Sequence, residues 1–439
     1  MITPIFSLTQ DADMVILIIK APLAKVSECE IEFGGRECYF SCKPYYLRLY
    51  LPGQVVENGK ESAKFDHNNN EFEIRMPKLH PNEQFSGLDM ITQLLTRPRP
   101  GLEHADPLVQ ELDPDVDQEL IDASVEADAW IEQHAVKDGE TLAQTSSDEF
   151  GYGFGTLRNN VIHRLMDEIQ CTIAVPDPDR TSIEDRLRFE YDQTAEKFDV
   201  EYYLADLFDP SDELQACLDW HSPWFDAKSD HVWITDTHRV QMKDLAKRVT
   251  PRLTAKQHKR VMHTLVDLLY AYCYDMRVTM GEHTVESSWT IITMCPSLCC
   301  LVAYDDNVQS VIVRSMRRAL SYPLYRHWTL AGTVLADVIQ VMKCGGSCIL
   351  SCLLDIYSLL CTGGEYRYIH NDLYVTDYIR WIQTLNDDSK VLDGIIDELD
   401  CLKIEKSDLA LDLDDYELTA EMQRLRVQKA DALDSDDEQ

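Results

Sequence analysis

The residues best suited to chemistry in this chain lie in small groups of histidine, cysteine and carboxylate side chains. The segment HTVESSW, from His283 to Trp289, brings a histidine, a glutamate and two serines together. Nucleophilic catalysis needs a nucleophile, a base and a group that orients the base, all within hydrogen-bonding reach. The segment supplies no such partner set, so a helix cap or a buried polar network is favoured. An enzyme that uses His283 and Glu286 remains an alternative.

Two groups of cysteines have spacings that raise the question of a metal site. Cys344, Cys348 and Cys352 recur every four residues and can share one face of a helix. A second group consists of Cys295, Cys299 and Cys300. Structural zinc sites usually take four ligands, commonly from Cys-x₂₋₄-Cys pairs. Neither group has a second pair or a histidine at a suitable spacing, which favours burial as small apolar side chains. We therefore predict no metal, no cofactor and no catalytic residue.

The glycine-rich segment FGYGFG superficially resembles a phosphate-binding loop, with Gly151, Gly153 and Gly155 alternating with aromatic residues. No strand pattern precedes it, no Lys-Ser/Thr follows it, and its flank is acidic, which disfavours phosphate. The alternation instead predicts a segment that docks on a helical domain and leads into a helix.

Charge is the first positive indication of function. The 439 residues contain 77 acidic and 41 basic side chains, for a net charge of −36. Such a chain repels nucleic acid and anionic membranes and is attracted to basic surfaces. Arg314, Arg317, Arg318 and Arg326 form a basic cluster, for which internal pairing is favoured over a nucleic-acid patch. We expect no direct nucleic-acid binding and no membrane span, because no run of about 18 apolar residues occurs.

The acidic residues are concentrated in two segments. The first, within a predicted flexible linker over 96–149, has 15 acidic residues and one basic residue between Glu103 and Glu149, with a transient helix over 117–131 as an option. The second is a predicted C-terminal extension over 393–439, with 16 acidic and five basic residues. Its first half suits a helix that packs on the body, and its second half, LALDLDDYEL, suits an extended segment that binds a basic groove. The carboxylates that we expect to replace phosphates are Asp408, Asp412, Asp414, Asp415 and Glu417, although a solubilising tail is the alternative.

Two different periodicities predict the elements that must position these groups. Over residues 1–95 apolar side chains alternate, as in Val15/Leu17/Ile19, Leu47/Leu49/Leu51 and Phe72/Ile74/Met76. This predicts an all-β antiparallel sandwich, in which Gly34-Gly35 and Asn58-Gly59 are expected at hairpin turns.

Over residues 150–392 the apolar period changes to three and four. The series after Val261, Leu330 and Ile349 indicate helices with one buried face, punctuated by Gly345-Gly346 and Gly363-Gly364. The chain is therefore predicted to be multidomain, with the sandwich followed by an all-helical domain.

Several fragments carry a family resemblance. PYYLRLYLPG, EFEIRMPK and FSGLDMITQLL resemble a CS domain, the small sandwich of heat-shock proteins and co-chaperones. The later fragments YGFG, KFDVEYYLADLF, GEHTVESSW, RRALSYPLYRHW, CLLDIYSLL and NDLYVTDYIRWIQ follow in the order found in the assembly chaperones of H/ACA ribonucleoproteins. The chain as a whole resembles that family.

The resemblance implies a non-enzymatic function. Proteins of this kind hold the dyskerin-type pseudouridine synthase before its RNA joins, occupy the RNA-binding face as an RNA mimic, and so prevent aggregation and premature RNA binding. It implies a monomer in the nucleus and cytoplasm that acts in H/ACA particle biogenesis and hence ribosome biogenesis. The alternative is a co-chaperone of the ninety-kilodalton heat-shock ATPase that works through the CS domain.

Overall fold

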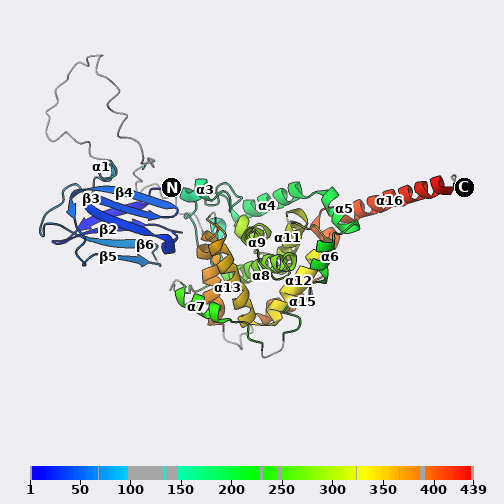
Figure 1. The fold of residues 1–439 in the computed structure, drawn as a ribbon. Coiled ribbons are helices and arrows are strands. Elements are labelled where there is room, and N and C mark those ends of the chain that lie inside the picture. Colours follow the sequence, from blue (N-terminus) through cyan, green and yellow to red (C-terminus); the bar gives the residue numbers. More distant parts are fainter. Residues whose placement is uncertain are drawn as a thin grey trace, which may run out of the picture. The chain divides into compact units, whose positions relative to one another are not determined.

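The computed structural model describes residues 2–67, 69–96, 133, 147–227, 231–245, 250–322, 324–364, 366–385 and 391–436. The chain divides into two compact units, Met1–Thr141 and Leu142–Gln439, which Figure 1 shows as a β unit and a helical unit. The predicted linker, with its optional helix over 117–131, lies outside the described residues except for Thr96, Gln133 and 147–149.

The first unit consists of two antiparallel sheets. One sheet has the strand order β1-β2-β6-β5, and the other pairs β3 with β4. The strands are β1 (Ile5–Gln10), β2 (Met14–Lys20), β3 (Glu30–Cys42), β4 (Tyr45–Val55), β5 (Ser62–Asp66) and β6 (Glu71–Pro77), and a short helix follows, α1 (Ile91–Leu95).

The core of this unit is built from the alternating residues of the sequence. All nine apolar residues of the three predicted strand faces are buried, because successive side chains of a strand point to opposite faces. Phe40 of β3 meets Phe72 of β6 edge-to-face, with ring centroids 5.0 Å apart, so side chains of the two sheets share one core. The predicted antiparallel sandwich is therefore confirmed.

Neither glycine pair forms the hairpin turn that was predicted. Gly34 and Gly35 lie inside β3, where the register with β4 shifts between Gly35 and Glu37. A bulge uses the conformational freedom of glycine as a turn does, which explains the error. Asn58 and Gly59 connect β4 to β5, which belong to different sheets.

The second unit contains no β-strand in its described part and confirms the predicted helical domain. Its elements are α2 (Ser147–Phe150), η4 (Phe154–Thr156), η5 (His163–Leu165), α3 (Met166–Ile169), α4 (Ile183–Lys197), α5 (Val200–Phe208), α6 (Asp212–Asp219), α7 (Asp236–Asp244), α8 (Ala255–Val278), α9 (Ser287–Met294), α10 (Pro296–Cys299), α11 (Val308–Ser321), α12 (Trp328–Lys343), α13 (Gly346–Thr362), the π-helical turn η6 (Asn371–Val375), α14 (Thr376–Thr384), α15 (Asp393–Asp400), η7 (Lys406–Leu409) and α16 (Leu413–Asp436).

Helix α8 is the centre of the helical unit, with α9, α11 and α12 packed around it (Figure 1). It begins at a capping box formed by Thr254 and Gln257. Every residue from Arg260 to Arg277 is buried, so the helix is enclosed on all sides rather than on one face as its periodicity predicts. Each buried charge must then find a partner, and Arg260 meets Asp305 at 2.6 Å.

The other predicted helices form as expected. The apolar series that follow Leu330 and Ile349 are buried in α12 and α13. Gly345 precedes α13 with a φ of 86°, and Gly363 ends that helix, so both glycine pairs occupy helix boundaries. Within the described residues, none of the helices has the length and apolar character needed to cross a bilayer.

His370, which directly precedes η6, makes stability depend on pH. Its side chain is fully buried, and burial lowers its pKa from 6.5 to about 4. The unfolded chain therefore takes up a proton near pH 6.5, whereas the folded protein does so only near pH 4. Stability is intact above pH 6.5 and falls as the pH drops from 6.5 to 4, by about 1.4 kcal/mol per unit.

Urea unfolding at pH 7 and pH 4.5 tests this assignment. A His370→Gln variant should lose roughly 2–3 kcal/mol less than the parent protein between the two pH values. The paired measurement removes the contribution of carboxylates, which both proteins share. Equal losses in the two proteins would contradict the role of His370.

Candidate functional site

The candidate site is the acidic segment that follows α15, residues 405–417, which we call the acidic strap. Leu409, Leu411 and Leu413 are buried and pack the strap onto the helical unit, where η7 contacts α11. The apolar-acidic alternation therefore places its leucines on the protein's own body and leaves its aspartates outward.

Four of the five predicted site residues are exposed on this strap. They are Asp408, Asp412, Asp414 and Asp415. Asp408 also accepts the backbone N–H of Glu405 at 2.8 Å, which closes the turn of η7. The prediction of an extended second half is wrong from Leu413 onwards, because α16 begins there. In Figure 1 this helix leads away from the body of the helical unit.

Glu417, the fifth predicted site residue, is half-buried and is bound by the protein's own side chains. Its carboxylate accepts a hydrogen bond of 2.5 Å from the Tyr203 hydroxyl of α5 and an ion pair of 2.5 Å from Lys406. Burial raises the pKa of Tyr203, and the nearby Glu417 carboxylate raises that pKa further. The phenol therefore stays protonated and acts as the hydrogen-bond donor. The Asp414 carboxylate lies 3.8 Å from the same lysine nitrogen. Glu417 thus fastens the start of α16 to α5.

Arg317 of α11 holds the middle of the strap. Its guanidinium is buried and donates to the main-chain carbonyls of Leu409 and Ala410. It also donates to the carbonyl of Tyr191 at 3.3 Å and lies 4.0 Å above the ring of that tyrosine. A guanidinium suits this task because its donors are fixed in a planar fork.

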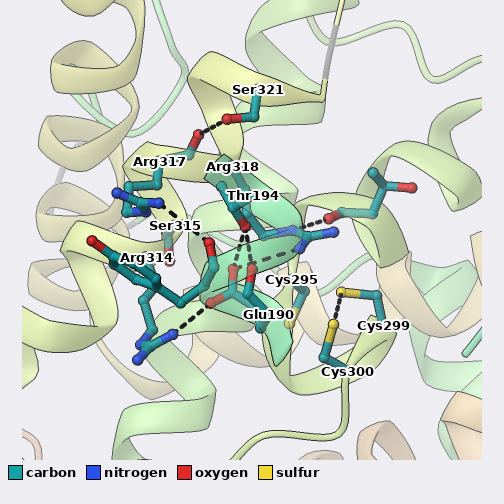
Figure 2. A network of polar contacts seen from close by, with 12 residues as sticks. Glu190, Thr194, Cys295, Cys299, Cys300, Arg314, Ser315, Arg317, Arg318 and Ser321 are labelled. Atoms are coloured by element: carbon teal, nitrogen blue, oxygen red, sulfur yellow. Dashed lines mark hydrogen bonds and ion pairs between the residues drawn. The ribbon is translucent and has the colours of Figure 1, made fainter. Parts of the chain in front are cut away.

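Arg314 and Arg318 pair with an acidic residue of the protein itself, as predicted for the arginine cluster. Figure 2 shows Arg314 and Arg318 of α11 on either side of Glu190 of α4. The Arg314 and Arg318 nitrogens lie 2.6 and 3.5 Å from the Glu190 carboxylate, and Thr194 donates to it at 2.8 Å. Arg326 stacks 4.7 Å above the ring of Tyr202. The Glu190 contacts join α4 to α11, and the Arg326 contact joins α5 to the segment between α11 and α12.

The histidine segment is built as a polar network. The Nδ1 atom of His283 lies 2.7 Å from the carboxylate of buried Asp275, and the hydroxyl of Ser287 accepts the N–H of Thr284 at 2.9 Å. Glu286 is exposed where α9 begins. These contacts fit the predicted buried network and helix start, and they do not place Glu286 beside His283.

The cysteines are mostly core residues. Cys348 and Cys352 are buried in α13, Cys344 is half-buried, and Cys295, Cys299 and Cys300 are buried near α10. In the described parts of the chain, no set of three or more His, Cys, Asp or Glu side chains is arranged to hold a metal ion.

Sequence reasoning missed two supports of the strap. Tyr203 belongs to the quoted motif KFDVEYYLADLF, but no local pattern connects it to Glu417, which lies 214 residues later. Arg317 was identified only as a member of a cluster. A buried arginine needs several acceptors, and main-chain carbonyls carry no signal in the sequence.

Comparison with known proteins identifies both units. Residues 3–95 match the family model described as "SHQ1-like, CS domain", and residues 224–413 match "SHQ1 protein, Shq1 domain". The second match ends at Leu413 and so includes most of the strap.

Relatives align over nearly the whole chain. "Protein SHQ1 homolog" of Mus musculus is 38% identical over 439 residues, covering 96% of this chain and 75% of the relative. Its namesake in Caenorhabditis elegans is 36% identical, covering 100% and 99%. "Protein shq1" of Schizosaccharomyces pombe is 31% identical, covering 88% and 90%. With both units matched, the motif resemblance is confirmed and the chain belongs to the SHQ1 family.

Proposed function

We propose that this protein is an assembly chaperone for H/ACA ribonucleoproteins that acts in the nucleus and cytoplasm. It binds the RNA-binding face of the dyskerin-type pseudouridine synthase before RNA joins, and thereby prevents aggregation and premature RNA binding. Family membership over both units supports a general role in H/ACA assembly. The net charge of −36 supports a basic protein surface as the partner and disfavours nucleic acid.

The observation that carries the proposal is that the leucines of the strap are buried while four of its aspartates are exposed. Leu409, Leu411 and Leu413 are buried in the helical unit, whereas Asp408, Asp412, Asp414 and Asp415 are exposed. A carboxylate accepts bidentate hydrogen bonds from arginine much as a phosphate does. An exposed set of carboxylates fixed to a folded body therefore offers cationic side chains the acceptors that an RNA backbone would offer.

Neutralising the four aspartates should weaken the complex with RNA-free synthase. We expect a variant with Asp408, Asp412, Asp414 and Asp415 changed to Asn to bind roughly 10- to 100-fold more weakly, because each lost contact is a charge-assisted hydrogen bond. Affinity measured by calorimetry between 50 and 300 mM salt should also show a shallower salt dependence.

A matched control separates local contacts from net charge. Glu30, Glu32, Glu57 and Asp89 are exposed acidic residues of the first unit, and changing them to Gln or Asn removes the same charge. This control should bind within about threefold of the parent protein if the strap makes the contacts. Equal weakening in both variants would show that only overall charge matters.

Competition tests the site on the synthase itself. Guide RNA and this protein should displace each other from the synthase. Simultaneous binding without mutual weakening would refute the proposed masking.

The match of residues 3–95 to a CS domain favours one alternative, a co-chaperone function that works through this domain. If the full chain used as bait retained the ninety-kilodalton heat-shock ATPase and not the synthase, the co-chaperone function would be preferred.

A further inference from the structure

The backbone of the acidic strap is held in a bend that its residues do not favour. Ala410 has φ and ψ of 48° and 48°, and Asp412 has a φ of 50°. Residues other than glycine enter this left-handed region at a cost in free energy, which is smaller for aspartate than for alanine. They persist there only when surrounding contacts fix the backbone, as often happens at binding sites. The bend therefore needs an explanation in the contacts around it.

Arg317 supplies the contact at the bend. It donates to the carbonyls of Leu409 and Ala410, the residues that lead into and form the first left-handed position. Its acceptors are main-chain carbonyls, so it holds the backbone without using any carboxylate of the strap. The neighbouring aspartates thus keep their charge for another partner.

Lys406 supplies the contact at the C-terminal end of the strap, at Glu417. Its ammonium lies 2.5 Å from Glu417 and 3.8 Å from Asp414, so it joins η7 to the first turns of α16. Tyr203 binds Glu417 from α5 at 2.5 Å. The strap is thereby fixed at two points, with Ala410 at the first and Asp412 between the two.

We propose that Arg317 and Lys406 are positioning residues that hold the acidic strap bent in advance for a basic protein surface shaped to take phosphates. The inference rests on the proposed function and deepens it, because it assigns binding to the shape of the strap as well as to its charge. A flexible tail must lose conformational freedom when it binds, whereas a strap that is already ordered does not. Glu417 then acts by fastening the strap rather than by touching the partner.

Two substitutions separate shape from charge, because the two explanations predict opposite signs. Arg317→Met and Lys406→Met each make the protein more acidic, so charge alone predicts tighter binding to a basic synthase. If shape matters, both variants bind RNA-free synthase more weakly, by about tenfold for Arg317→Met and about threefold for Lys406→Met. Arg239→Met is the matched control, since Arg239 is exposed on α7 and pairs with Asp236.

Hydrogen exchange in the free variants measures the strap directly. The amides of residues 409–415 should exchange at least about tenfold faster in Arg317→Met than in the parent protein, whereas those of α8 should not change. Lys406 is half-buried, so Lys406→Met keeps the test available if Arg317→Met fails to fold. Unchanged exchange in the strap, or binding as tight as that of the Arg239→Met control, would overturn the inference. If the parent protein itself failed to bind the synthase, the proposed function would fall, and the exchange rates would still decide whether these residues hold the strap.

Discussion

Changing Glu190 to Ala is expected to lower the free energy of unfolding of the helical unit by about 3–5 kcal/mol. Glu190 is 1% exposed and is the acidic group between Arg314 and Arg318 in Figure 2. Without it Arg318, which is 2% exposed, keeps its charge in the interior with the carbonyl of Thr293 as a hydrogen-bond acceptor. An uncompensated buried charge is among the most costly defects that a single substitution produces.

Urea unfolding followed by tryptophan fluorescence measures this loss. The control is Glu184→Ala on the same helix, because the side chain of Glu184 is 86% exposed and its ion pair with Arg188 spans 3.6 Å. An exposed pair of this kind contributes less than about 1 kcal/mol. If Glu190→Ala were no more destabilising than Glu184→Ala, the network in Figure 2 would not stabilise the fold.

Changing Asp337 to Ala should have a comparable effect, about 3–5 kcal/mol, through a different pair of helices. Asp337 of α12 is fully buried and accepts two hydrogen bonds from Arg277 of α8, at 2.6 and 3.0 Å. It accepts a third, at 2.7 Å, from the hydroxyl of Ser222. The substitution therefore leaves a buried guanidinium without its carboxylate and frees the segment that contains Ser222.

A second substitution in the same cycle tests the cause. Arg277→Met added to Asp337→Ala removes the unpaired buried charge and should recover part of the lost stability. If the two changes acted independently, the double variant would instead be less stable than either single variant. Thermal unfolding of the four proteins gives the coupling free energy. Hydrogen exchange at residues 220–224 should rise in Asp337→Ala. If the double variant were less stable than the parent protein by the full sum of the two single losses, a charge-pair explanation would be contradicted.

The elements that could be predicted are those whose side chains repeat along the chain. Leu47, Leu49 and Leu51 alternate, and that pattern alone places them on the inner face of β4. The three- and four-residue period after Leu330 places its members on the buried face of α12 in the same way. Local periodicity suffices here because burial is decided by which face of an element the residue occupies.

The parts that could not be predicted depend on contacts between distant segments. Gly34-Gly35 has the composition of a turn but forms a bulge, and only the pairing of β3 with β4 distinguishes the two. In the strap, alternation correctly separates leucines from aspartates. It does not reveal that the leucines face the protein's own body, or that Glu417 faces Tyr203 rather than solvent. Those outcomes depend on α5 and α11, which lie roughly 100 to 200 residues earlier in the sequence.

The packing of the strap against the helical unit has a consequence for shortened forms of the protein. Leu409, Leu411 and Leu413 are buried in the helical unit, and Arg317 of α11 donates to the carbonyl of Leu409. Removing everything after residue 402 would therefore open the interior as well as delete acidic groups. Such a shortened chain would expose the apolar surface that the three leucines cover. The guanidinium of Arg317 would also lose two of its hydrogen-bond acceptors. It should appear in the cell mainly as a substrate for quality control, and its failure to bind a partner would say little about recognition.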